Sequence, residues 1–264
     1  MSSRLRLLLS AAQFLLVTTA LAWLVWLAVN ENTIRATPAA LPWIGMAIVV
    51  NLAALSLMGK RLGYLAQRWC LIARDTSLQA LNYQSLFYLF VLPLGVGMEA
   101  ARYVGFRALA PAAARRDIAV CVLTDRVLGL LAALLAGSIA WWLTGGQPIW
   151  IAAAAIVTTA ALVVAVHITP LGVRQLITGL AYALAFHALT YVAIWAVCHG
   201  LDVGLDFWQM VFGVAAGVLG AVLPVALFGV QAGDLATAAI LTWTGTSVLT
   251  GGIVASVAYL SRLQ

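Results

Sequence analysis

The chain is a series of long apolar runs separated by short polar loops. Most of the runs reach the roughly 20 residues that a helix needs to cross a hydrocarbon core about 30 Å thick. The pattern therefore predicts an all-α polytopic membrane protein with one membrane domain over residues 1–264. The predicted segments cover approximately residues 7–29, 39–58, 78–98, 118–143, 149–166, 176–198, 208–230 and 235–260.

The third and seventh segments carry helix-breaking residues. Each contains Leu-Pro followed by glycines, and the expected turn residues are Pro93, Gly95 and Gly97 in the first and Pro224, Gly229 and Gly233 in the second. One interpretation is that each proline only kinks a helix that spans the membrane. The other is a re-entrant hairpin that enters and leaves on one face, which requires surrounding protein or a water-filled cavity.

The distribution of basic residues favours the hairpins. If all eight segments cross, seven loop Lys and Arg residues fall on the inner side and six on the outer side. If the third and seventh segments turn back, twelve fall inside and one outside, as the positive-inside rule predicts. The sequence thus predicts about six transmembrane helices, two re-entrant hairpins, and N- and C-termini in the cytoplasm.

This topology also predicts an internal repeat. The halves, about residues 1–146 and 147–264, would each contain two spans, a hairpin and a further span, in opposite orientations. Interrupted helices at matching positions of inverted repeats point to the binding site of a transporter. We therefore expect the two hairpins to meet inside the protein, one from each face.

The composition narrows the possible functions. The chain is 64% apolar and 8% charged, with a mean hydropathy of +1.06, whereas about a quarter of residues are charged in soluble domains. The short loops leave no place for an ATPase domain, so we expect any transport to be passive or driven by an ion gradient or potential. The net charge of +6 comes from loop residues, which indicates membrane orientation and anionic lipid rather than nucleic acid.

Cysteine spacing gives no sign of a cofactor. Cys70, Cys121 and Cys198 form no CxxC-like pair, and such spacing is typical of metal and redox sites. We expect neither metal nor cofactor, and the oligomeric state stays open.

The first candidate site follows the first break. Glu99 and Arg102 are three residues apart, so they share a face on a helix. Arg107 could extend this stripe, but a loop arginine that snorkels to water is the better interpretation for it. We expect Glu99 and Arg102 to contact substrate.

The second candidate lies within the fourth segment. Arg126 is nine residues beyond Asp117, about 13 Å along a helix at 1.5 Å per residue. A charge at that depth is costly and by default faces the bundle interior. Its neighbour Asp125 points about 100° away, so we expect Asp125 to accept from an arginine on another element. A structural ion pair is the alternative to substrate binding by these two residues.

Asp234 follows the second break and opens the last predicted span. It could cap that helix by accepting from the N–H groups of the first turn. It could equally be the counterpart of Glu99 in the second half and contact substrate.

Three stretches resemble one known family, and the resemblance covers about residues 40–260. They are LPLGVGMEAAR (Leu92 to Arg102), TDRVLG (Thr124 to Gly129) and LPVALFGVQAGD (Leu223 to Asp234). Their order and spacing are similar to the membrane domain of the lysylphosphatidylglycerol synthase/flippase family. The resemblance implies a standalone integral membrane protein linked to envelope lipids.

The chain departs from the family pattern at several turn positions, where Leu94, Met98, Val230 and Ala232 stand in place of glycines. It also has no aminoacyl-transferase domain, so synthesis of lysyl-phospholipid is not implied. These changes could alter the cavity, and the family's substrate is therefore not carried over.

The resulting prediction is a lipid flippase of the bacterial inner membrane that moves an anionic phospholipid or a polyprenyl-phosphate-linked glycolipid between leaflets. Its partners would be that lipid and the membrane. Two alternatives stay open: a membrane-embedded enzyme acting on lipid phosphates, for which no Ser/His pair is apparent, and a non-catalytic subunit of an envelope pathway.

Overall fold

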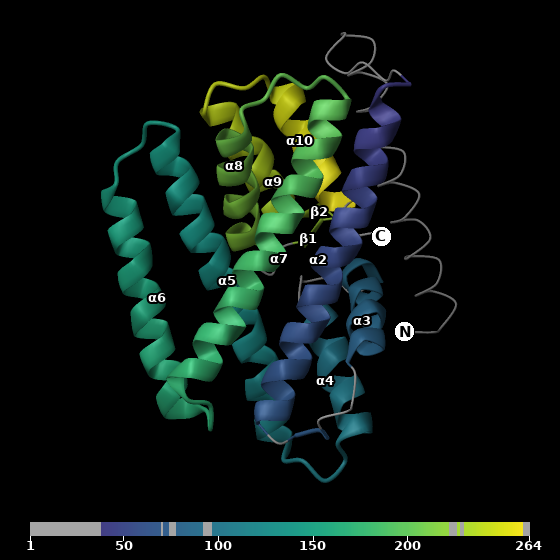
Figure 1. The fold of residues 1–264 in the computed structure, drawn as a ribbon, viewed down its shortest axis with the longest axis vertical. Coiled ribbons are helices and arrows are strands. Elements are labelled where there is room, and N and C mark those ends of the chain that lie inside the picture. Colours follow the sequence, from purple (N-terminus) through teal and green to yellow (C-terminus); the bar gives the residue numbers. More distant parts are fainter. Residues whose placement is uncertain are drawn as a thin grey trace.

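The architecture is a bundle of long helices with two pairs of short helices packed against it (Figure 1). The computed structural model describes residues 38–69, 71–73, 78–91, 97–221, 226–227 and 230–260. The predicted first segment, residues 7–29, lies outside the described residues. The all-α prediction is confirmed, apart from one pair of two-residue strands, β1 (Ala226–Leu227) and β2 (Val230–Gln231).

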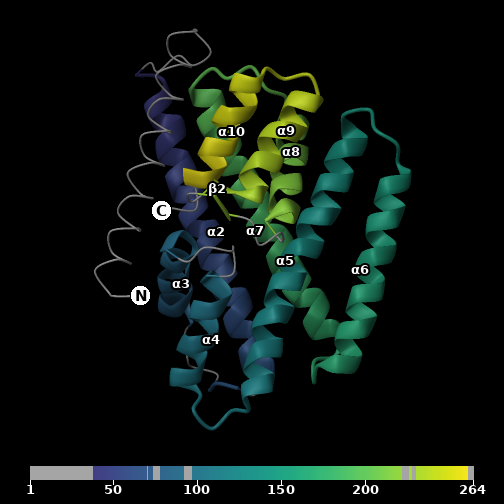
Figure 2. The same cartoon turned by 180° about the vertical axis from the view of Figure 1, so that it is seen from behind.

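Four of the described helices are long and apolar enough to cross a membrane, as is typical of membrane proteins. They are α2 (Ala40–Arg68), α5 (Arg115–Leu143), α6 (Ile149–Ile168) and α7 (Val173–Gly200). Helices α2 and α7 pack closely along each other at the centre, and α6 stands at the edge (Figures 1 and 2).

Four of the short helices form two antiparallel pairs. The first pair is α3 (Gln79–Val91) and α4 (Gly97–Leu109), and the second is α8 (Phe207–Gly220) and α9 (Ala232–Trp243). Helices of this length reach only about 20 Å, which is too short for a hydrocarbon core. The α3–α4 pair lies in the lower half of the molecule and the α8–α9 pair in the upper half (Figure 1).

Some predicted segment boundaries are wrong. Segment 39–58 continues to Arg68, so Lys60 and Arg61 lie in a helix rather than in a loop. Segment 235–260 is not one helix: α9 ends at Trp243 and α10 (Val248–Leu260) follows it. Between them, Gly245 has a φ of +96°, a left-handed conformation that ends helices and that glycine adopts readily.

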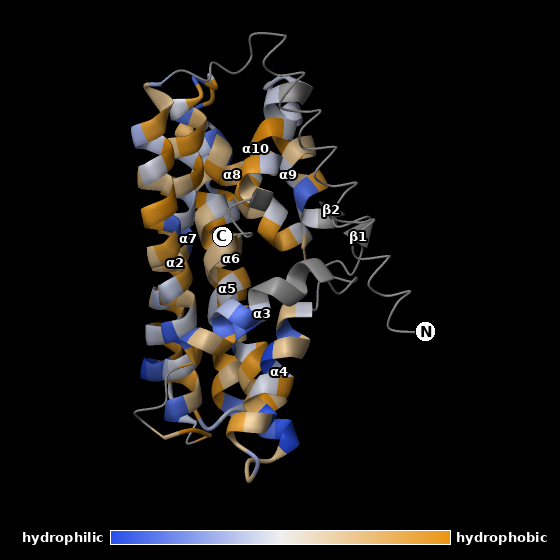
Figure 3. Cartoon of the chain, turned by 90° about the vertical axis from the view of Figure 1, so that its right-hand side faces the viewer, coloured by the Kyte–Doolittle hydropathy of each residue, from blue (hydrophilic) through white to orange (hydrophobic). Residues whose placement is uncertain are grey.

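The polar residues are unevenly distributed along the long axis. Hydrophilic positions gather at the end of the molecule that contains α4, while apolar positions dominate elsewhere (Figure 3). Helices α2 and α4 end there, and α5 and α7 begin there (Figure 1). The basic residues at those helix ends are Arg68, Arg107, Arg115, Arg116 and Arg174.

Candidate functional site

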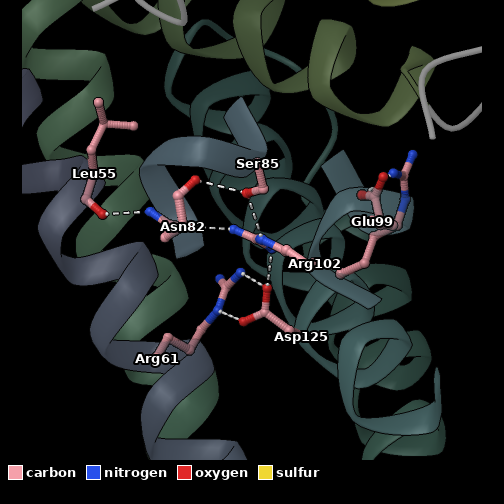
Figure 4. A network of polar contacts seen from close by, with 8 residues as sticks. Leu55, Arg61, Asn82, Ser85, Glu99, Arg102 and Asp125 are labelled. Carbon is pink, nitrogen blue, oxygen red and sulfur yellow. Dashed lines mark hydrogen bonds and ion pairs between the residues drawn. The ribbon is translucent and has the colours of Figure 1, made fainter. Parts of the chain in front are cut away.

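The site is built around the carboxylate of Asp125 on α5. Arg61 of α2 donates to both of its oxygens, from Nε to Oδ1 at 2.6 Å and from Nη2 to Oδ2 at 3.0 Å. Arg102 of α4 donates from Nη1 to Oδ2 at 2.9 Å. The three side chains are at most 4% exposed. The prediction that Asp125 accepts from an arginine on another element is confirmed, and two arginines do so (Figure 4).

Arg102 also binds the first short helix of its own pair. Its Nε donates to Oγ of Ser85 at 3.3 Å, and its Nη2 donates to Oδ1 of Asn82. The Nδ2 group of Asn82 in turn donates to the carbonyl oxygen of Leu55 on α2 at 3.2 Å. All three nitrogens of Arg102 are therefore engaged by protein groups, and its contacts join α3, α4 and α5 (Figure 4).

Glycines allow the α3–α4 pair to approach this network. A Cβ atom at Gly59 of α2 would overlap the side chain of Gln79, and one at Gly105 of α4 would overlap that of Leu81. The close approach lets Nε2 of Gln79 donate to the carbonyl oxygen of Ser56 at 2.8 Å. The short pair is thus held by hydrogen bonds as well as by apolar contacts.

Arg126 occupies a different position from its neighbour Asp125. Its Nη1 donates to Oε1 of Glu99, in the first turn of α4, and its Nη2 donates to the carbonyl oxygen of Ala221 at 3.2 Å. Ala221 is the C-cap residue of α8. One guanidinium on α5 therefore contacts both short pairs where each approaches its turn.

These charged groups line a cavity of about 200 Å³. Its walls come from α2, α4, α5, α7, α8 and α10, and most of the lining atoms are apolar. On α7, His187 and Tyr191 face the cavity; a hydrogen bond of 3.0 Å joins Nε2 of His187 to the carbonyl oxygen of Gly129. The cavity is thus mostly apolar, and its charged groups lie where the two short helix pairs meet.

The structure brings together four of the five predicted substrate-binding residues. Glu99, Arg102, Asp125 and Arg126 all line the cavity. Asp234 is buried in the first turn of α9 but does not line it. Arg107 lies apart and donates to the carbonyl oxygen of Ala113 at 3.1 Å.

The predicted turn residues divide into two groups. Pro93, Gly95, Pro224 and Gly229 lie outside the described residues. Gly97 and Gly233 lie at helix ends: Gly97 is the first residue of α4 and Gly233 the second of α9. Gly233 is needed for packing, because a Cβ there would overlap the carbonyl oxygen of Gly217 on α8.

Arg61 is one site residue that the sequence did not predict. If the second segment ends at residue 58, Arg61 falls in the loop that follows and counts as a loop charge. The available signal was helical spacing: Met58, Leu62 and Leu65 continue one apolar face beyond that point, and all three are buried.

Among the described residues, no group of three His, Cys, Asp or Glu side chains could hold a metal ion. No protein-family model, curated protein or solved structure matches the chain. The function must therefore be argued from the site itself: three guanidinium groups and two carboxylates in an apolar chamber, a set suited to an anionic group.

Proposed function

We propose that the chain is a lipid flippase that moves an anionic phospholipid or a polyprenyl-phosphate-linked glycolipid between the leaflets of a bacterial inner membrane. Arg61 and Arg126 would attract the lipid phosphate. Glu99 and Asp125 would limit the positive charge of the empty cavity. Arg102 would position Asp125 and the α3–α4 pair.

The observation that carries the proposal is the position of Arg126. It reaches from a long apolar helix to both short pairs, at Glu99 and at the carbonyl oxygen of Ala221. Charged residues within membrane helices face interiors or cavities and mark substrate paths. A phosphate head group needs such a compensated polar path, because an unpaired charge in hydrocarbon is very costly.

The proposal includes a finer topology. The α3–α4 and α8–α9 pairs would be re-entrant hairpins entering from opposite faces, within six transmembrane helices arranged as two inverted repeats. The element order supports it, since α2 and α7 are each followed by a short pair and a further helix. The resemblance to the lysylphosphatidylglycerol synthase/flippase membrane domain points to the same arrangement. Movement of the hairpins about the cavity would open it to each leaflet in turn.

The orientation belongs to the proposal as well. The end of the molecule rich in arginine would face the cytoplasm, according to the positive-inside rule. Cysteine substitution of Ala113, in the loop between α4 and α5, tests this with a membrane-impermeant maleimide. We expect labelling only from the cytoplasmic side, and labelling from outside would contradict both the orientation and the first hairpin.

Leaflet exchange in liposomes tests the function. The purified protein would be reconstituted with fluorescent anionic lipids, and exchange measured by quenching of the outer leaflet. We expect Arg126→Ala to slow exchange by about tenfold or more, because hydrogen bonds to charged groups contribute about 1.5–3 kcal/mol. Arg126→Lys should retain part of the rate, because lysine keeps the positive charge but not the planar guanidinium group.

Arg174→Ala is the matched control, because Arg174 is exposed in the first turn of α7, away from the cavity. Unfolding of each variant in detergent would separate lost function from lost folding. Absence of exchange with every lipid, or equal exchange by the wild type and a folded Arg126→Ala variant, would overturn the proposed function.

A further inference from the structure

Three polar atoms in the cavity are left without a hydrogen-bond partner among the described residues. They are Nη1 of Arg61, the hydroxyl of Tyr191 and Oε2 of Glu99, and all three atoms are buried. Arg61 is only 4% exposed and Tyr191 only 3%. An unsatisfied buried polar group costs about 1–3 kcal/mol, so this combination indicates a place for polar ligand atoms.

The hydrogen-bonding capacity of these three atoms defines the chemical groups that such a ligand must carry. The free N–H group of Arg61 needs an acceptor, and guanidinium suits a phosphate oxygen. The hydroxyl of Tyr191 can donate or accept, whereas the carboxylate oxygen of Glu99 can only accept. A ligand that satisfies all three atoms has a phosphate oxygen and at least one hydroxyl group.

The charge of the cavity limits the number of phosphates. Arg61, Arg102 and Arg126 face the carboxylates of Asp125 and Glu99. One positive charge remains, which one phosphodiester group neutralises. A diphosphate would leave uncompensated negative charge in an apolar chamber, at a large cost in desolvation.

The size of the cavity limits the head group. Its volume of about 200 Å³ is below the 300–1,000 Å³ of pockets that take drug-sized ligands. A phosphate with a glycerol or a single sugar is of suitable size for this volume. The hydrocarbon chains of such a lipid would remain outside the cavity.

We propose that this cavity selects lipids with one phosphodiester and a small, uncharged, hydroxyl-bearing head group. Arg61 binds the phosphate, while Tyr191 and Glu99 bind the head-group hydroxyls. The inference rests on the proposed function and specifies its substrate class. Both glycerol phospholipids and polyprenyl-phosphate-linked single sugars have this chemistry.

The test compares labelled lipids in the same liposomes. The probes are phosphatidylglycerol, phosphatidylcholine, a polyprenyl monophosphate-linked single sugar and a polyprenyl diphosphate-linked sugar. We expect phosphatidylglycerol, the monophosphate-linked sugar, or both to exchange at least about tenfold faster than the other two. The faster of phosphatidylglycerol and the monophosphate-linked sugar identifies the source of the substrate.

Tyr191→Phe sharpens the test, since it removes one oxygen atom that makes no hydrogen bond to the described protein. We expect exchange of the preferred lipid to fall about three- to tenfold, with the rate for phosphatidylcholine unchanged. Tyr182→Phe is the control, because Tyr182 contacts Tyr64 and does not line the cavity.

Each outcome is decisive. Equal exchange of all four lipids, fastest exchange of the diphosphate-linked sugar, or an unchanged rate in Tyr191→Phe would overturn this inference and leave the flippase function standing. A wild-type protein that exchanges none of the lipids would overturn the proposed function and this inference with it.

Discussion

The two short helix pairs have similar shapes but are held in place by different forces. The α3–α4 pair is bound to its neighbours by polar side chains: Asn82 links it to α2 and Arg102 links it to α5. It also brings Glu99 to Arg126. In this pair Glu99 and Arg102 both hold the fold and line the cavity.

The α8–α9 pair is held by close packing of small residues. Cβ atoms built at Gly217 and Gly233 would each overlap atoms of the facing helix, and one at Gly137 of α5 would lie 2.9 Å from the Cβ of Ala215. It contacts the charged site through the carbonyl oxygen of Ala221, which accepts from Arg126. This pair therefore supplies shape, whereas the α3–α4 pair supplies charge.

The difference indicates how each pair tolerates change. A buried charge cluster is destabilised strongly when one member is removed, because the remaining charges stay uncompensated. Close backbone packing is instead sensitive to added volume. The two kinds of substitution should thus separate loss of the site from loss of packing.

The largest effect is expected for Asp125→Asn. The substitution leaves Arg61 and Arg102 buried without their shared carboxylate, which should lower the free energy of unfolding by about 3–5 kcal/mol. Denaturant unfolding in detergent measures this, and lipid exchange should be lost as well. Asp117→Asn, in the first turn of α5, is the control and should change stability by less than about 1 kcal/mol.

A triple replacement distinguishes stability from function. The substitutions Arg61→Met, Asp125→Leu and Arg102→Met together remove all three charges of this buried ion-pair network. Such a replacement by apolar residues is often neutral or stabilising. The triple variant should regain most of the free energy of unfolding that Asp125→Asn loses, but lipid exchange should stay absent. Wild-type stability in Asp125→Asn, or exchange by the triple variant, would contradict the dual role assigned to this cluster.

A smaller effect is expected for Gly233→Ala in the other pair. The new methyl group would meet the carbonyl oxygen of Gly217 and lie 3.1 Å from the backbone nitrogen of Ala221. Backbone atoms cannot rotate away, so we expect a loss of about 1–3 kcal/mol. The folded fraction should keep its preference among lipids, because the charge cluster is unchanged.

Gly63→Ala is the matched control for that substitution. A Cβ at Gly63 of α2 has no atom within 4 Å, and alanine favours a helix by about 0.5–1 kcal/mol over glycine. Stability should therefore stay equal or rise. Equal behaviour of the two alanine variants would show that the α8–α9 pair is not held by close packing.

Much of the fold follows from apolar periodicity. The segments 118–143 and 149–166 agree closely with α5 and α6, because their charges and loops lie where the helices end. The segment 235–260 does not, since no charge or proline marks the stretch TWTGTS (residues 242–247), where α9 ends and Gly245 takes a left-handed conformation.

The site was predictable to the extent that its charges stood out against apolar sequence. Arg126 and Asp125 do so, and both line the cavity. Arg61 does not stand out, because Lys60 precedes it and two adjacent basic residues are typical of a loop. Which arginine binds which carboxylate depends on the packing of α2, α4 and α5, and no spacing along the chain contains that information.

The most direct test of the account is a reversible link between the two short pairs. In a cysteine-free background, cysteines at Met98 of α4 and Val218 of α8, which both line the cavity, would be joined by a bifunctional methanethiosulfonate reagent. Single-cysteine variants treated alike are the controls. We expect the link to stop lipid exchange and reduction to restore it. Exchange at the same rate in the linked and reduced protein would contradict it.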